Sequence, residues 1–544
     1  MPLASRRSQI AFGATVALLA ALFVFLNVVR IVEPLGVDQG LFACFTRWVP
    51  HGWLPYRDIF DSKPPLFLYT YALAAAIPGD VVRAIWWLEA AWLAATLGVG
   101  YLLGARLGGR WAGLATASLL FIGLWSPAWG GFWSRAQSEE MLALPMLGSA
   151  WLAWRAMDRA PLALWAGVLA GVCGLYKIPS MAIAGAWALT WLMRASPGVG
   201  TSTASTSRRA HYLGAARRIA LLGTGIAAPW ALAVAWFAAH GALPSFVDGV
   251  FVYHRYNAAY IAPPWADVAR DFSVTMVLQG SLLLVAAAIG IVTMRRGRAR
   301  EVIWVGSWIA MTLAAIVLQR QLAGYHYLLA IPALAVAGGV GLVDAVRGAI
   351  DAKESARTAH VIALAAMIAL GGREMATWYK GYSLDADCLR GRITREEYLR
   401  RIQQGNYSLI TEAAAATYLD THTSKADGIL VWGLSPGIYA LADRHPTTRF
   451  PFHKLLMTDA PLSRMWPGLE ARRAQFMAGL SADPPAYILV GRGDRNGFEP
   501  EDSLTSMMRF GPFQDLILRE YAKETQIGHF LVFRRGRSRA NEAP

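Results

Sequence analysis

The sequence predicts an α-helical polytopic membrane protein that carries a small α/β domain at its C-terminal end. Hydrophobic residues make up 55% of the 544 residues, and charged residues only 16%. Soluble domains carry about 25% charged residues, so a chain this poor in polar groups needs a bilayer as its solvent. From about residue 378 the composition changes to mixed acidic and basic residues with short apolar runs. This change indicates a domain outside the membrane.

The net charge of +15 does not indicate a nucleic-acid partner. Many Lys and Arg residues stand in short clusters between apolar runs, as expected where basic residues fix membrane topology. No basic stretch with interleaved aromatic residues resembles a nucleic-acid module, so we expect no such partner. Cys44, Cys173 and Cys388 are too few for a disulfide scaffold and lack metal-ligand spacing, although Cys44 and Cys388 fall on the same predicted side of the membrane.

Eleven apolar runs are long enough to cross about 30 Å of hydrocarbon. They lie near 9–29, 82–104, 111–127, 139–155, 161–176, 179–194, 219–239, 273–293, 301–318, 325–346 and 359–377. Basic residues gather at the loops of one side, which predicts a cytoplasmic amino terminus and an external C-terminal domain. The first run lacks a small-residue cleavage site, so we interpret it as an uncleaved anchor.

Two domains follow from this pattern: a transmembrane domain at 1–377, with its first external loop at 30–80, and a soluble α/β domain at 378–544. In the second domain, Thr394 and Glu397 have capping-box spacing. Short β-prone runs bounded by Gly, Pro or Asp predict strands at Ile429–Trp432, Tyr487–Val490 and Phe530–Phe533. Helices are expected near 409–420, 436–443 and 466–480.

The first external loop holds the strongest functional signal, since about fifty residues exceed what a connector between two helices needs. Asp38 follows the first helix. Asp58, Asp61 and Lys63 precede a Pro-Pro pair that fixes Lys63 in an extended approach to the next helix. The loop's many aromatic residues are expected to lie along the membrane interface. Alternatively, the charges only anchor the helices, with Asp58 and Asp61 locking the neighbouring cations in place.

Further ionisable residues stand at the ends of later apolar runs. They are Glu139 at the start of the fourth run, Lys177 at the end of the fifth, and Arg320, Tyr325 and His326 at the tenth. Each has a plain structural explanation: helix capping or pairing with Arg135 for the Glu, snorkelling for the Lys, and a packed core position for the His. Because the predicted topology places them on the same face as the first loop, we expect a site for an anionic lipid phosphate and a general base.

Several segments resemble the bacterial GT-C glycosyltransferases of the protein O-mannosyltransferase and aminoarabinose-transferase (PMT/ArnT-like) type. They are Asp38-Gln39-Gly40, Tyr56-Arg57-Asp58 with Asp61-Ser62-Lys63-Pro64-Pro65, Ser138-Glu139, Lys177, Tyr325-His326-Tyr327 with Pro332-Ala333-Leu334, Val431-Trp432-Gly433, Ile438-Tyr439, Arg444 and Thr448-Arg449-Phe450. The chain departs from the family at Gln39, where members often carry Glu, and at Ser62, where aminoarabinose transferases carry Glu. Both departures remove a carboxylate, which argues against a simple aminoarabinose transferase.

The resemblance implies a multi-pass protein of the bacterial inner membrane that transfers a sugar from a polyprenyl-phosphate donor to an envelope lipid, polysaccharide or protein on the periplasmic face. Asp38 would be the general base of an inverting attack. The donor phosphate would be bound by Lys63, Lys177, Arg320 and His326. The acceptor or a metal would be supported by Asp58, Asp61, Glu139 and Tyr325. Where the family uses a divalent metal, Mg²⁺ or Mn²⁺, Asp38 and Glu139 would hold it.

Two other functions stay open at the level of sequence. A transporter or flippase for an anionic lipid-linked sugar predicts ionisable residues at the membrane midplane and repeated halves, and the sequence shows neither clearly. A non-enzymatic subunit of a polymer-assembly system would instead use the outer domain to hold a partner.

Overall fold

The computed structural model describes residues 6–193, 204–295, 298–351, 353–403, 407–457, 467–495 and 501–536. The chain divides into two compact units. Unit 1 consists of Met1–Ile31, Glu89–Ala235 and Ala262–Ser383, and unit 2 of Val32–Leu88, Trp236–Ile261 and Leu384–Pro544. The border at Ser383 lies close to the domain boundary predicted at 377, but unit 2 also contains the first external loop.

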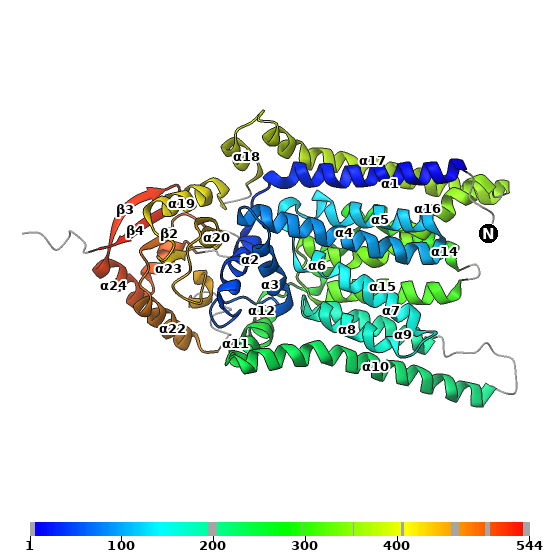
Figure 1. Cartoon of the computed structure of the whole chain (residues 1–544), viewed down its shortest axis with the longest axis horizontal. Helices are drawn as coiled ribbons and strands as arrows, with labels where there is room; N and C mark the ends of the chain where they lie inside the picture. The colour runs from blue at the N-terminus through cyan, green and yellow to red at the C-terminus, as the bar shows by residue number, and fades with distance from the viewer. Residues whose placement is uncertain are drawn as a thin grey trace, which may run out of the picture. The chain divides into compact units, whose positions relative to one another are not determined.

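Unit 1 is built from long helices that pack side by side (Figure 1). The helices that lie wholly or mostly in it are α1 (Arg6–Val29), α4 (Val81–Gly108), α5 (Arg110–Trp125), α6 (Ser138–Met141), α7 (Ala143–Ala156), α8 (Leu162–Gly174), α9 (Ala182–Met193), α10 (Ala204–Ala239), α13 (Trp265–Gln279), α14 (Ser281–Met294), α15 (Ala299–Leu318), α16 (Ile331–Asp351) and α17 (Glu354–Leu389). Helix α16 packs on α5 and α14, and α8 packs on α7. A Cβ on Gly341 would lie 2.4 Å from the Ala286 carbonyl oxygen, so only glycine permits this close approach of α16 to α14.

Among the described residues, seven helices are long and apolar enough to cross a membrane, or eight if the pair α13–α14, bent by 85°, is counted as one span. The chain is therefore a multi-pass membrane protein. The other three of the eleven predicted spans fall on α6 with α7, on α8 and on α9. Helices α7, α8 and α9 have 14, 13 and 12 residues. At 1.5 Å per residue none of them alone covers the hydrocarbon thickness, because the chain turns at Leu142 and again at Lys177.

Unit 2 contains a four-stranded sheet in the order β1-β2-β4-β3. Strand β1 (Ile429–Trp432) runs parallel to β2 (Tyr487–Gly491), and β4 (Phe530–Arg535) pairs antiparallel with both β2 and β3 (Tyr521–Ile527). The three predicted strands are confirmed. Strand β3 was not predicted, because it is a largely exposed edge strand whose polar sequence lacks an apolar run.

Unit 2 also contains helices, two of which are formed by the first loop. They are α2 (Val37–Trp48), α3 (Pro65–Ala72), α11 (Leu243–Val247), α12 (Tyr253–Ile261), α18 (Arg395–Ile402), α19 (Leu409–His422), α20 (Gly437–Ala442), α22 (Leu469–Ala482), α23 (Ser503–Met508) and α24 (Gly511–Glu520). The predicted helices near 409–420, 436–443 and 466–480 are confirmed as α19, α20 and α22. The capping box is confirmed as well, since the Thr394 hydroxyl accepts the Glu397 N–H at 3.1 Å.

The first loop is a folded part of unit 2. Phe42, Phe45, Phe60 and Phe67 are buried within the protein, so these four side chains do not face a membrane; that the segment lies along the interface stays a prediction. The segment folds into α2 and α3, and their apolar sides need a protein partner. Helix α2 finds one in α20, where a Cβ on Gly40 would lie 2.6 Å from the Cα of Gly437. Glycines at both positions let the two helices touch.

Candidate functional site

Asp61 organises the turn that precedes α3. Its Oδ1 accepts the backbone N–H groups of Ser62 at 2.5 Å and Lys63 at 2.8 Å. Its Oδ2 is buried and has no hydrogen-bond partner among the described residues. Burial raises the pKa of Asp61 to about 6, the hydrogen bond and charge of Lys63 oppose this rise, and the charge of Asp38 adds to it. Three of the predicted residues therefore interact within unit 2.

The backbone around Lys63 is fixed from two sides. The Tyr56 hydroxyl donates to the Lys63 carbonyl at 2.7 Å, and His254 Nε2 lies 2.6 Å from the Ser62 carbonyl. Because a carbonyl only accepts, this His254 nitrogen carries the proton. The Lys63 ammonium lies 5.9 Å from the centre of the Phe42 ring, within cation–π range. Helix α3 begins at Pro65, as the Pro-Pro pair predicted.

Asp38 and Asp58 have different surroundings. Asp38 is half-buried in the first turn of α2, where free backbone N–H groups favour a carboxylate. The Asp58 carboxylate accepts the Arg57 guanidinium at 2.8 Å on each oxygen and the Leu54 N–H at 2.7 Å. These contacts favour the locking role for Asp58 over a role at the acceptor.

Unit 1 holds a second cluster, around Glu139 at the start of α6. Glu139 is fully buried. Its Oε2 accepts the Ser138 hydroxyl at 2.7 Å, and its Oε1 forms a short ion pair with the Lys177 ammonium. His326 Nε2 lies 3.7 Å from the same Oε1, while His326 Nδ1 faces the Gln321 carbonyl at 2.6 Å. Lys177 reaches Glu139 because the chain is extended between α8 and the following 3₁₀ turn. The structure thus brings three predicted residues together in unit 1.

The neighbouring acids of unit 1 have other partners. Arg135 pairs with Glu89 and donates to the Arg30 carbonyl at 2.9 Å, while Glu140 accepts the Ala136 N–H at 2.8 Å. The expected alternative, in which Arg135 neutralises Glu139, is therefore not the pairing that the structure shows.

Arg320 and Tyr325 lie near this cluster in sequence but differ in contacts. Arg320 has a left-handed backbone (φ 56°) and donates from two guanidinium nitrogens to the Pro263 carbonyl. Its guanidinium also stacks 4.6 Å from the centre of the Trp265 ring. Tyr325 packs edge-on against His326, with ring centres 4.7 Å apart.

The expected metal ligands do not fit a divalent cation in this arrangement. Both Glu139 oxygens are engaged, one of them by the Lys177 ammonium, whose charge would repel a cation. Within the described ranges, three or more His, Cys, Asp or Glu side chains do not gather as a metal site.

A buried acid of unit 2 and its part-buried partner were missed at the sequence level. Tyr407 donates its hydroxyl to Glu412 Oε2 at 2.5 Å, and Glu412 is only 2% exposed in the first turn of α19. Burial raises the pKa of Glu412 to about 7, and the hydrogen bond from Tyr407 opposes the rise. An acid at a helix start is usually a dipole partner, so the sequence carried no signal for this pair.

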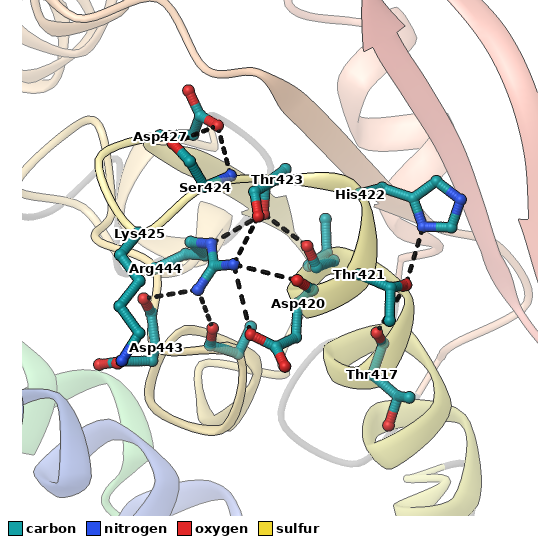
Figure 2. Close-up of polar contacts among 12 residues, drawn as sticks. Thr417, Asp420, Thr421, His422, Thr423, Ser424, Lys425, Asp427, Asp443 and Arg444 are labelled. Atoms are coloured by element: carbon teal, nitrogen blue, oxygen red, sulfur yellow. Dashed lines mark hydrogen bonds and ion pairs between the residues drawn. The ribbon is translucent and has the colours of Figure 1, made fainter.

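Arg444, one of the residues that carried the family resemblance, binds at the opposite, C-terminal end of α19 (Figure 2). Its guanidinium donates to the Ala442 carbonyl at 2.7 Å, the Thr423 carbonyl at 2.7 Å and the Asp420 carbonyl at 3.2 Å. These carbonyls lie at the C-terminal ends of α19 and α20, where the helix dipole favours a cation. Arg444 therefore fixes α20 relative to α19.

Comparison with solved structures places the fold. The chain is similar to ArnT from Cupriavidus metallidurans bound to undecaprenyl phosphate, with a TM-score of 0.59 and 15% identity over 97% of this chain and 98% of that one. For the same protein in the apo state the TM-score is 0.56 at 15% identity, over 96% and 98% of the two chains. The apo oligosaccharyltransferase of Archaeoglobus fulgidus gives a TM-score of 0.50 at 13% identity, over 99% of this chain and 76% of that one.

No family model matches the chain, and no curated sequence is similar to it. At these identities the likeness to solved structures establishes the fold. The chain has the GT-C membrane fold with a small C-terminal sheet.

Proposed function

We propose that this chain transfers a sugar from a polyprenyl-phosphate donor to a hydroxyl acceptor of the cell envelope, on the outer face of the bacterial cytoplasmic membrane. The observation that carries the proposal is the buried Asp61 carboxyl beside Lys63 and Asp38, with one oxygen open, on a GT-C fold. The similar ArnT structure holds undecaprenyl phosphate, which supports a lipid phosphate as the donor. The C-terminal α/β domain lies on the outer face in this proposal.

In the proposed reaction Asp38 is the general base. The acceptor hydroxyl gives its proton to Asp38, and its oxygen attacks the anomeric carbon from the face opposite the phosphate. The bond between the anomeric carbon and the phosphate oxygen breaks, and its electron pair leaves with the lipid phosphate, so the anomeric centre inverts. Asp61 is assigned to the acceptor side, because its Oδ2 has no hydrogen-bond partner among the described residues.

The donor phosphate is assigned to Lys63, Lys177, Arg320 and His326, because fixed cations stabilise the charge that develops on a leaving phosphate. The contacts of three of these residues indicate how readily each could bind a phosphate. Lys63 has its backbone held and its ammonium against a ring face. Lys177 is already balanced by Glu139, and Arg320 must first release the Pro263 carbonyl, so it ranks last.

The test is Asp38→Asn in cells that lack the chromosomal gene, with envelope glycolipids, polysaccharides and glycoproteins compared by mass spectrometry. Wild-type complementation should restore a gene-dependent sugar. Asp38→Asn should lower its rate of formation by about 100-fold or more, as expected for loss of a general base. Asp80→Asn is the matched control, since Asp80 is an exposed acid whose Oδ1 accepts the Arg83 N–H, a contact that Asn keeps.

Undiminished transfer by Asp38→Asn would remove Asp38 as the base. A flippase would be supported by a different result. The purified chain would move fluorescent undecaprenyl phosphate across phosphatidylcholine liposomes, and no gene-dependent sugar would appear in the envelope.

A further inference from the structure

The Tyr407–Glu412 pair lies against the helix that carries the proposed base. Gly40, two residues after Asp38 on α2, touches Gly437 at the start of α20. A Cβ on Gly437 would in turn lie 2.9 Å from Glu412 Oε1. The first turn of α2, the start of α20 and the first turn of α19 therefore meet at two glycines. Side chains at either glycine would push the three elements apart.

Glu412 is a buried acid that faces both Tyr407 and the start of α20. Its Oε2 accepts the Tyr407 hydroxyl at 2.5 Å, and the backbone N–H of Gly437 also stabilises its charged form. An acid that only capped α19 would not need burial, and the N-cap itself is supplied by Ser408, whose hydroxyl accepts the Thr411 N–H at 3.3 Å. Capping of α19 therefore does not explain Glu412, whose carboxylate instead faces the start of α20 and Tyr407.

The ionisable groups around Glu412 link it to the first loop. Tyr407 faces it directly, and Cys44 of α2 lies within its electrostatic range. Burial, then the charge of Glu412, raises the pKa of Tyr407, and the charge of Asp38 adds to this rise. Burial likewise raises the pKa of the Cys44 thiol, which stays neutral, and both Glu412 and Asp61 act on it. Tyr407 thus lies within range of the two acids Glu412 and Asp38.

We propose that Glu412 is a positioning residue for the proposed reaction: its carboxylate, acting through Tyr407, supplies negative charge beside Asp38 that favours uptake of the acceptor proton. The inference rests on the proposed function and gives the C-terminal domain a part in the chemistry. When Glu412 is protonated, its charge disappears and transfer slows. When it is ionised, the low dielectric of the buried site makes its charge effective over a longer range than in water.

The chain offers a matched control. Tyr418 donates its hydroxyl to Glu524 at 3.0 Å, so it forms the same kind of pair in the same unit, but on the exposed surface. Glu524→Gln should leave the transfer rate and its pH dependence unchanged, because solvent screens the charge of Glu524.

The first measurement needs no substrate. Full-length protein in phosphatidylcholine vesicles is titrated by difference infrared spectroscopy, which follows the C=O band of protonated carboxyl groups. We expect a band that disappears near pH 7, is absent in Glu412→Gln and is unchanged in Glu524→Gln. Its midpoint should rise in Tyr407→Phe, which loses the hydrogen bond to the carboxylate, and fall in Asp38→Asn, which loses a neighbouring negative charge. A midpoint that Asp38→Asn does not move would overturn the inference.

The second measurement is the rate at which spheroplasts form the gene-dependent sugar product at pH 6 and pH 8. If Asp61, with a pKa of about 6, and Glu412, with a pKa of about 7, must both be ionised, the wild-type rate should rise by about twentyfold over this range. Glu412→Gln should reduce the rise to about twofold, the part that Asp61 retains.

A merely structural role would lower the rate equally at both pH values and keep the twentyfold rise, which would also overturn the inference. The two measurements separate it from the proposed function. If wild-type cells form no gene-dependent sugar, the proposed function fails, yet the infrared midpoint of Asp38→Asn still decides whether Glu412 and Asp38 act on one another.

Discussion

The two clusters of buried charge differ in how the oxygens of their carboxylates are paired. In unit 1, both oxygens of Glu139 are engaged, one by the Ser138 hydroxyl and one by the Lys177 ammonium. In unit 2, Asp61 has one oxygen bound by backbone N–H groups and the other open. A paired carboxylate is held in its charged form and orients a cation. A buried carboxylate with one unpartnered oxygen takes up a proton more readily. We therefore expect substitutions in the two clusters to differ in their effects on stability and on its pH dependence.

The largest effect is expected where the neutral pair of unit 1 is broken. Lys177→Met leaves the buried Glu139 charge without its cation, which should destabilise the protein by about 3–5 kcal/mol. Thermal unfolding in detergent micelles measures the loss. A thiol-reactive dye is a suitable probe, because Cys44 and Cys173 are both free and buried and become accessible on unfolding.

The double variant Lys177→Met, Glu139→Gln is the control for this result. Removing the charge of Glu139 as well should restore most of the stability, whereas transfer should stay low, since Lys177 is assigned to the donor phosphate. If the single and double variants unfold at the same temperature, the ion pair is not what stabilises this part of unit 1.

A smaller, pH-dependent effect is expected at Asp61. Its pKa is raised from 3.8 to about 6, so the folded state binds the proton more tightly than the unfolded state does. Folding stability is therefore lost as the pH rises through this range, by about 3 kcal/mol in total. Asp61→Asn cannot titrate. Its stability relative to the wild type should rise by about this amount between pH 4 and pH 8.

Comparing stability at two pH values removes the cost of burying the new amide from the result. The new amide buries an N–H₂ group without a partner, but this cost is the same at both pH values and cancels in the difference. Asp80→Asn, at an exposed acid, should keep the wild-type pH dependence. A pH-independent effect of Asp61→Asn would mean that Asp61 is not desolvated, and its proposed role at the acceptor would lose its basis.

The sequence predicted those features that depend on local pattern. Continuous apolar runs bounded by Gly, Pro or Asp predicted β1, β2 and β4, and the capping box at Thr394 was visible as a spacing. Strand β3 has no such run because its side chains are mostly exposed and its pairing comes from β4. Helix α2 was hidden in a segment interpreted as a loop, since it packs on α20, far along the chain, as well as on α3.

The sequence predicted which residues belong to the site better than it predicted which of them pair with one another. Membrane topology assigned Glu139, Lys177 and His326 to one face, and the structure brings these three together. Topology fixes only the depth of a residue, not which helix lies beside it, so the pairing of Arg135 with Glu89 could not be derived. The pair of Tyr407 and Glu412 depends on two glycines, Gly40 and Gly437, that are 397 positions apart in the printed sequence. The assignment of all the candidates to one substrate stays a prediction.

The smallest effect is expected from Tyr56, a neutral side chain that holds the backbone of Lys63 in place. Tyr56→Phe removes the hydroxyl that donates to the Lys63 carbonyl at 2.7 Å, and should cost about 1 kcal/mol of stability. Because Lys63 is assigned to the donor phosphate, the variant should also raise KM for the lipid donor more than it lowers kcat.

Tyr439→Phe provides the matched comparison for Tyr56→Phe. Tyr439 is equally buried in unit 2, and its hydroxyl accepts the Val431 N–H at 2.8 Å, far along the chain from Lys63. It should lose a similar stability without a change in KM for the donor. If both variants raise KM alike, the effect of Tyr56 comes from general loosening of unit 2, and the turn at Lys63 does not need its hydroxyl.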